Sequence, residues 1–193
     1  MVSPLASPCP SSRRFALAAV ALTTALSSGL SHAGSWFEPV RLGAAAGAGN
    51  DAAMARLEAR WNLKQDLWAT SSQSVRLRLG VEASAGVWNP HGGSGHALGD
   101  LGVTPILRLQ GAGSSGVFVE AGVGMHVLSR THLSDEKVFS TAFQFGDRVA
   151  VGYRFGDALD SELALRLQHY SNAGIKEPNP GINFFLLQYS ARF

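Results

Sequence analysis

The sequence is poor in cysteine and in charge, and after residue 33 it has no apolar run long enough for a membrane helix. Cys9 lies in an N-terminal segment that we expect to be removed, so disulfides, thiolate catalysis and cysteine-based zinc sites are excluded from the mature chain. Charged residues make up 16% of the 193 residues, but an apolar share of 46% is too high for a disordered chain. Without Arg13 and Arg14, 14 basic residues balance 14 acidic ones, which gives no support to a nucleic-acid partner.

Residues 1–33 are expected to be a cleaved signal peptide. Two arginines precede an apolar stretch (15–30), and small residues stand at both selective positions before a cut after Ala33. The alternative is an uncleaved membrane anchor, but the stretch is short for a bilayer span and carries four hydroxyl groups. The remainder, 34–193, is exported and is long enough for a single domain with its own core.

From residue 37 onward, apolar side chains alternate with polar or small ones, which is the periodicity of β-strands. Val75, Leu77 and Leu79, for example, share one face, while Arg76 and Arg78 share the other. Turn-forming residues separate eight such segments, which extend over 37–48, 52–66, 73–88, 98–110, 116–129, 142–155, 161–172 and 181–193. Most of these segments are much longer than the strands of soluble proteins, which average about 5–6 residues.

Two all-β architectures fit this pattern. In a soluble sandwich the charged face would meet water, whereas in an outer-membrane barrel the apolar face meets lipid and the charged face points inward. The strand length matches a tilted membrane span, and the chain ends on an alternating strand closed by an aromatic, Phe193, as outer-membrane barrels do. Tyr153, Phe155, Tyr189 and Phe193 would form an aromatic girdle at one rim. We therefore predict an eight-stranded antiparallel transmembrane β-barrel of the bacterial outer membrane.

Charged side chains would then point into the barrel, and we expect them to pair there because a lone buried charge is costly. They are Glu58, Arg60, Arg76, Arg78, Glu82, Arg108, Glu120, Arg148, Glu162 and Arg166. An eight-stranded barrel filled in this way has no wide channel, so passive diffusion is not expected to be its main role.

One polar pair interrupts the lipid-facing surface, because His169 and Ser171 continue the apolar face of 163–167. If the pair is exposed in a loop or at the membrane interface, it costs little free energy and needs no function. If it faces lipid, it is costly, and polar groups kept at such a cost usually have a function. Residues i and i+2 on one strand face lie about 7 Å apart in Cα terms, so the histidine can act as base for a serine nucleophile. A second such pair, His132 and Ser134, lies in a polar stretch between strands and is interpreted as a solvated loop.

The residues around the first pair form a longer and more specific motif. His169-Tyr170-Ser171-Asn172-Ala173-Gly174-Ile175, followed by Pro178-Asn179-Pro180-Gly181, resembles the lipid A 3-O-deacylase (PagL) family. The close match covers 167–183, and the rest matches in architecture only. The resemblance implies an eight-stranded outer-membrane barrel and a serine esterase that removes the 3-position acyl chain of lipid A. Its substrate would be lipid A or lipopolysaccharide, and its surroundings outer-membrane lipid.

By position, the resemblance makes Ser171 the nucleophile and His169 its base. The acid of the family falls twelve residues after the nucleophile, where this chain has Asn183. If the last hairpin is centred on Lys176, Asn183 lies opposite His169, and its carbonyl can orient the imidazole without supplying a charge. Glu177, in the loop that joins the two strands, is a weak substitute for the missing charge.

The tetrahedral oxyanion of such a reaction needs hydrogen-bond donors. Asn172, the Gly174 amide and Asn179 lie in the loop that leaves Ser171 and are the candidates, the alternative being that they only form turns. No metal or other cofactor is expected, because the two histidines of 91–96 have no carboxylates beside them and calcium would need an acidic cluster.

The alternative function is a non-enzymatic small outer-membrane barrel with a structural or adhesive role. In that case the loops 89–97 and 129–140 would carry the function, and the pair of His169 and Ser171 would be incidental. The sequence leaves the oligomeric state open, a homodimer included.

Overall fold

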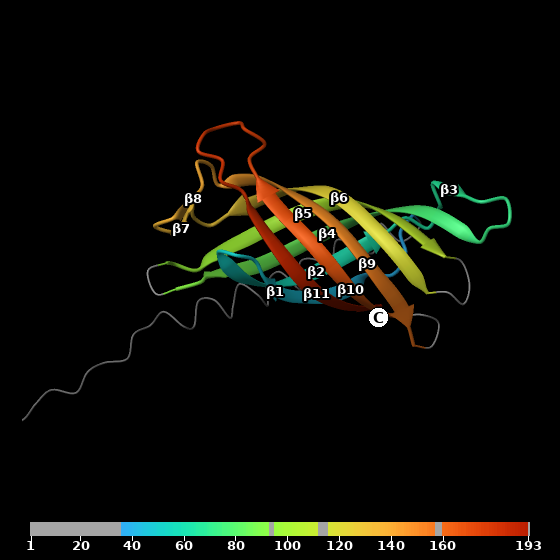
Figure 1. Ribbon diagram of the computed structural model, residues 1–193. Coiled ribbons are helices and arrows are strands. Elements are labelled where there is room, and N and C mark those ends of the chain that lie inside the picture. The colour runs from blue at the N-terminus through green and yellow to red at the C-terminus, as the bar shows by residue number, and fades with distance from the viewer. Residues whose placement is uncertain (1–35, 93–94, 112–115, 157–159, 193) are drawn as a thin grey trace, which may run out of the picture. The chain divides into compact units, whose positions relative to one another are not determined.

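The computed structural model describes residues 36–92, 95–111, 116–156 and 160–192, so the expected signal peptide lies outside it. Within this part of the chain, long strands wrap around a common axis and loops connect them (Figure 1). The long strands are β1 (Arg41–Ala48), β2 (Ala52–Asn62), β4 (Val75–Pro90), β5 (Leu98–Gly111), β6 (Val117–Leu128), β9 (Phe143–Phe155), β10 (Ser161–Ser171) and β11 (Ile182–Arg192). The short strands β3 (Trp68–Ala69), β7 (His132–Ser134) and β8 (Lys137–Val138) lie in the connections. No helix among the described residues is long and apolar enough to cross a membrane.

The sheet closes on itself into an eight-stranded antiparallel barrel. Consecutive long strands pair with each other, and β1 also pairs with β11, so no long strand in the described ranges has a free edge. Closure matters because lipid cannot hydrogen-bond an unpaired backbone group. The predicted barrel is confirmed. The largest differences at the strand ends are that the first strand begins at Arg41 rather than 37 and the second ends at Asn62 rather than 66, and the other ends differ by at most two residues.

The outward face of the barrel is apolar. Alternate side chains of each long strand point outward and are exposed or half-buried, and Leu167, for example, is 56% exposed. Tyr153, Phe155 and Tyr189 point outward at the same rim, where the rings of Phe155 and Tyr189 lie 6.5 Å apart between centroids. They fit the predicted aromatic girdle, whose fourth member, Phe193, lies outside the described residues. An apolar surface of this extent suits lipid rather than water.

The inward face carries a network of buried ion pairs. Arg148 donates hydrogen bonds to Glu82 and Glu120, both at 2.7 Å, and Arg60 lies 2.9 Å from Glu82. Other pairs of the network join Arg166 to Glu58, Arg108 to Glu120 and Glu162, Arg41 to Glu162, and Arg56 to Glu58. Because each of these carboxylates has an arginine partner, the cost of burying a lone charge is avoided.

Arg76 and Arg78 depart from the predicted pairing. They stand near the start of β4, where Arg78 donates a hydrogen bond to Glu38 at 2.8 Å. Asp66 lies 3.1 Å from Arg78 and 3.6 Å from Arg76. Glu82 follows further along the strand, so these two arginines are beyond the reach of the central network and pair with acids at one end of the barrel.

Behind β10 and β11 the interior is filled by aromatic side chains around Trp88. The Trp88 ring lies 4.6 Å from that of Tyr170 and 5.1 Å from that of Phe184, centroid to centroid, and all three are buried. Tyr170 stands between His169 and Ser171 in the sequence. This packing therefore fixes, from inside the barrel, the stretch of β10 that presents those two side chains to the outside.

Candidate active site

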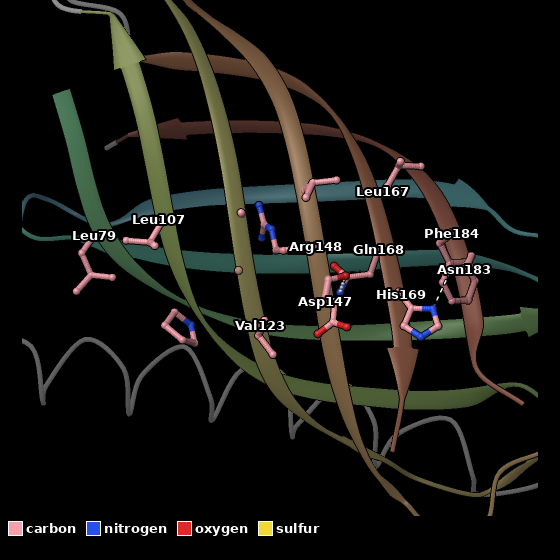
Figure 2. Close-up of a pocket in the computed structure, with 14 residues that line it drawn as sticks. Leu79, Leu107, Val123, Asp147, Arg148, Leu167, Gln168, His169, Asn183 and Phe184 are labelled. Carbon is pink, nitrogen blue, oxygen red and sulfur yellow. Dashed lines mark hydrogen bonds between the residues drawn. The ribbon is translucent and has the colours of Figure 1, made fainter. Parts of the chain in front are cut away.

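His169 lies on the outward face of β10 and is held by a residue of the neighbouring strand. The register of β10 and β11 places Asn183 directly opposite His169, as a hairpin centred on Lys176 predicts. The Nδ1 of His169 is 2.7 Å from the Oδ1 of Asn183 (Figure 2). Because a carbonyl oxygen only accepts a hydrogen bond, the proton is on Nδ1, and Nε2 is left free to act as a base.

Ser171 follows two residues later at the end of β10, on the same face and half-buried. In Figure 2 the ring edge of His169 that is not bonded to Asn183 turns toward this end of the strand. Among the described residues, no hydrogen bond joins the hydroxyl of Ser171 to the imidazole. The structure places the two side chains on one face of β10, and catalytic hydrogen bonds are often long without substrate and tighten in the complex.

Asn172 organises the loop that follows Ser171. Its Oδ1 accepts a hydrogen bond from the Gly174 amide at 2.9 Å, its backbone N–H donates to Asn179 Oδ1 at 3.0 Å, and its side-chain amide donates to the Lys176 carbonyl at 2.7 Å. The three oxyanion candidates thus lie together but are hydrogen-bonded to one another. Glu177 also bonds within the loop, because its Oε2 accepts from the Asn179 amide at 2.9 Å. Its carboxylate is therefore engaged away from the imidazole.

The β7–β8 hairpin and the chain after it support this loop from one side. Lys137 on β8 donates a hydrogen bond to the Gly181 carbonyl at 3.0 Å, and Ser140 donates one to the Lys176 carbonyl at 2.6 Å. The second histidine–serine pair lies in this hairpin, where His132 is exposed and its Nε2 is 3.5 Å from Asp135. The hairpin therefore buttresses the loop, and its own histidine faces solvent.

Gly181 packs directly against the imidazole of His169. A Cβ at this position would lie 3.0 Å from the Cε1 of the ring, and the φ angle of +57° favours glycine. The sequence pattern indicates only a turn here. The contact with the ring depends on the path of the whole loop, which the sequence does not give.

A groove of about 860 Å³ crosses the outer wall beside His169. Its lining comes from β4, β5, β6, β9, β10 and β11. His169 and Asn183 lie toward the β11 end, and Leu79 and Leu107 lie toward the β4 end, with mostly apolar side chains between them (Figure 2). The site thus combines a polar end with a long apolar surface.

Asp147 is a member of this groove that the sequence pattern does not single out. On β9 it lies opposite His169, on the side away from Asn183. It is exposed, and its carboxylate has no hydrogen bond or ion pair with another described residue. The alternation along 143–155 already puts this acid on the lipid-facing side, which is the signal that could have identified it. Its alignment with His169 depends on how β9 and β10 pair.

Comparison with known proteins identifies the family. The family model of lipid A 3-O-deacylase (PagL) matches residues 53–192. The chain belongs to this family. A lipid A deacylase PagL of Pseudomonas aeruginosa is 34% identical over 148 residues, which are 76% of this chain and 82% of that protein. A lipid A deacylase PagL of Bordetella bronchiseptica is 43% identical over 76 residues, which are 39% of this chain and 41% of that protein.

A solved PagL structure extends the likeness to three dimensions. The crystal structure of the outer membrane enzyme PagL matches with a TM-score of 0.69 at 30% identity, covering 79% of this chain and 99% of the other. The predicted family and the predicted outer-membrane barrel are therefore confirmed, and the soluble sandwich is excluded.

Proposed function

We propose that the protein hydrolyses the 3-O-linked acyl ester of lipid A, with Ser171 as the nucleophile and His169 as its base. The observation that carries this proposal is the hydrogen bond from His169 Nδ1 to Asn183, which leaves Nε2 free on the same strand face as Ser171. Membership of the PagL family supports the reaction and the substrate. A purely structural or adhesive barrel would have no use for a basic side chain and a hydroxyl on its lipid-facing wall.

The reaction follows the steps of serine esterases. The Ser171 oxygen attacks the ester carbonyl carbon while its proton passes to His169 Nε2, and a tetrahedral intermediate forms. Its collapse breaks the bond to the sugar oxygen, which takes the proton from the imidazolium, and leaves an acyl-enzyme. Water, deprotonated by His169, then attacks the acyl-enzyme. The fatty acid leaves and the serine hydroxyl is restored, so one water is consumed for each ester cleaved.

Donors for the oxyanion are proposed to come from the loop after Ser171. Asn172, the Gly174 amide and Asn179 are the candidates, and their mutual hydrogen bonds keep them close to the nucleophile. In the structure the Gly174 amide donates to Asn172 Oδ1, so binding of the oxyanion would exchange this internal partner for the substrate.

The position of the site suits a substrate that is embedded in a membrane. The loop that joins β10 and β11 lies at the barrel end opposite the C-terminus (Figure 1). If the C-terminus faces the periplasm, Ser171 is level with the outer leaflet, where lipid A resides. The apolar groove beside His169 would then receive a hydrocarbon chain without extracting lipid A from the membrane.

Mass spectrometry of lipid A from cells that express the chain tests this proposal. We expect the loss of one hydroxyacyl chain with the wild type and no loss with Ser171→Ala or His169→Ala. Ser134→Ala, in the second histidine–serine pair, serves as the matched control and keeps the wild-type product. Heat-modifiable gel mobility checks that each variant is folded. Unchanged lipid A with the wild type, both in cells and with purified protein in detergent, would contradict the activity, and full activity of Ser171→Ala would contradict the nucleophile.

A further inference from the structure

The lipid-facing wall of the barrel is almost free of charge. On the outward faces of β1, β2, β4, β5, β6, β9, β10 and β11, within the described ranges, Asp147 is the only acidic residue and His169 the only basic one. The remaining outward positions carry apolar, small, hydroxyl or amide side chains. Charged groups that face lipid are costly and are rarely kept without a function.

These two residues are direct cross-strand partners. The register aligns Val123, Asp147, His169 and Asn183 across four neighbouring strands, and Figure 2 shows them in a row along the wall. Side chains directly opposite each other on antiparallel strands have Cβ atoms about 4.5–5.5 Å apart. The imidazole of His169 therefore has an amide on one flank and a carboxylate on the other.

We propose that Asp147 is the charge partner of His169 and fulfils the role of the acid that position 183 lacks. The proposal rests on the esterase function proposed above. When the proton of Ser171 moves to Nε2, the imidazole becomes a cation, and the carboxylate of Asp147 stabilises that cation across the β9–β10 ladder. Asn183 holds the tautomer by its hydrogen bond to Nδ1. A single triad carboxylate both orients the imidazole and stabilises its charge. Here Asn183 on β11 performs the first task and Asp147 on β9 the second.

The charged residues near Asp147 in the sequence or the site have partners elsewhere, so they do not compete with Asp147 for His169. Arg148, the next residue, points inward, where it donates to Glu82 and Glu120 at 2.7 Å. Glu177, the other acid near the site, accepts a hydrogen bond from the amide of Asn179 within its own loop. The low dielectric of the surrounding lipid strengthens the attraction between the Asp147 carboxylate and an imidazolium at the facing position of the next strand.

Substitution of Asp147, with rates measured on purified lipid A in detergent, tests the proposal. We expect Asp147→Asn to lower kcat about tenfold to a hundredfold with little change in KM, because an opposite charge at this separation is worth one or more powers of ten. Asp147→Glu should keep most of the rate. Asp135→Asn, which changes the acid beside His132 on the hairpin, is the matched control and should behave as wild type.

A carboxylate introduced at position 183, on the other side of His169, distinguishes an electrostatic role of Asp147 from a structural one. Adding Asn183→Glu to Asp147→Asn should restore most of the lost kcat, since a carboxylate again adjoins the imidazole. The urea midpoint of Asp147→Asn should not fall, because a charge has been removed from the lipid-facing wall. Wild-type kcat in Asp147→Asn would overturn the proposal. A loss of kcat that neither Asp147→Glu nor the added Asn183→Glu relieves would also overturn it.

The proposed function itself is tested in the same assay by Ser171→Ala. If Ser171→Ala keeps its activity, the esterase mechanism fails whatever Asp147 does. If Ser171→Ala is inactive while Asp147→Asn is fully active, the esterase stands and only the role of Asp147 fails.

Discussion

Across the β10–β11 ladder, the Nδ1 of His169 donates a hydrogen bond to the Oδ1 of Asn183 over 2.7 Å. This bond fixes both the orientation of the imidazole and the location of its proton. An amide can do both but carries no charge, so it orients the base without stabilising the imidazolium. In the mechanism proposed above, Asn183 therefore supplies the orienting role of a triad acid but not its charge.

Asn183→Ala should lower the deacylation rate about tenfold or more, because the imidazole then loses its fixed orientation and tautomer. Asn183→Glu should keep or raise the rate, since a carboxylate both accepts the hydrogen bond and stabilises the imidazolium. Rates on purified lipid A in detergent decide between these outcomes. Heat-modifiable gel mobility must first show each variant folded, because Glu at 183 places a charge toward lipid. A wild-type rate in Asn183→Ala would refute the orienting role.

Gly181→Ala should reduce kcat, because a methyl group at 181 would press on the His169 ring, whose Cε1 lies 3.0 Å from the position of a Cβ. The φ of +57° adds backbone strain. Gly156→Ala is the matched control. Its φ is +85° and its Cβ would lie 4.0 Å from the nearest atom, the Ser161 Oγ, so it shares the strain without the contact. Equal rates for the two variants would show that the packing against the ring is unimportant.

Patterns along the chain predict the barrel and one side of the site. Strict alternation assigns side chains to the two faces, and the symmetry of a short hairpin is enough to align His169 with Asn183. Position 147 follows from the same reasoning. Alternation puts Asp147 on the outward face, and a symmetric hairpin that joins 142–155 to 161–172 brings it opposite His169. The PagL motif points to an acid only within the last hairpin, and not to the other strand neighbour of His169.

Contacts through the barrel interior are beyond the reach of such patterns. Tyr170 donates a hydrogen bond to Asp100 at 3.0 Å and accepts one from Arg56 at 2.7 Å. His126 completes this cluster, with its Nδ1 2.9 Å from Asp100. Asp100 and His126 lie on the paired strands β5 and β6, but Arg56 on β2 and Tyr170 on β10 reach them only across the interior of the closed barrel. The partner of Arg76 is equally hard to predict. Alternation indicates that its side chain points inward, but it does not identify Asp66 as the acid that pairs with it.

Glu120→Gln should destabilise the barrel strongly. Its carboxylate contacts Arg60, accepts a hydrogen bond from Arg108 Nε at 2.6 Å and another from Arg148 at 2.7 Å, and all of these side chains are buried. Without this charge the buried arginines lose an anionic partner, and removing one partner of a buried ion pair lowers the free energy of unfolding by about 3–5 kcal/mol. Arg76→Gln is the contrast, because its pair with Asp66 spans 3.6 Å, its side chain is 40% exposed, and such pairs contribute about 0–1 kcal/mol. Urea unfolding of the two variants in detergent measures the difference, and similar midpoints would show that the network carries no special share of the stability.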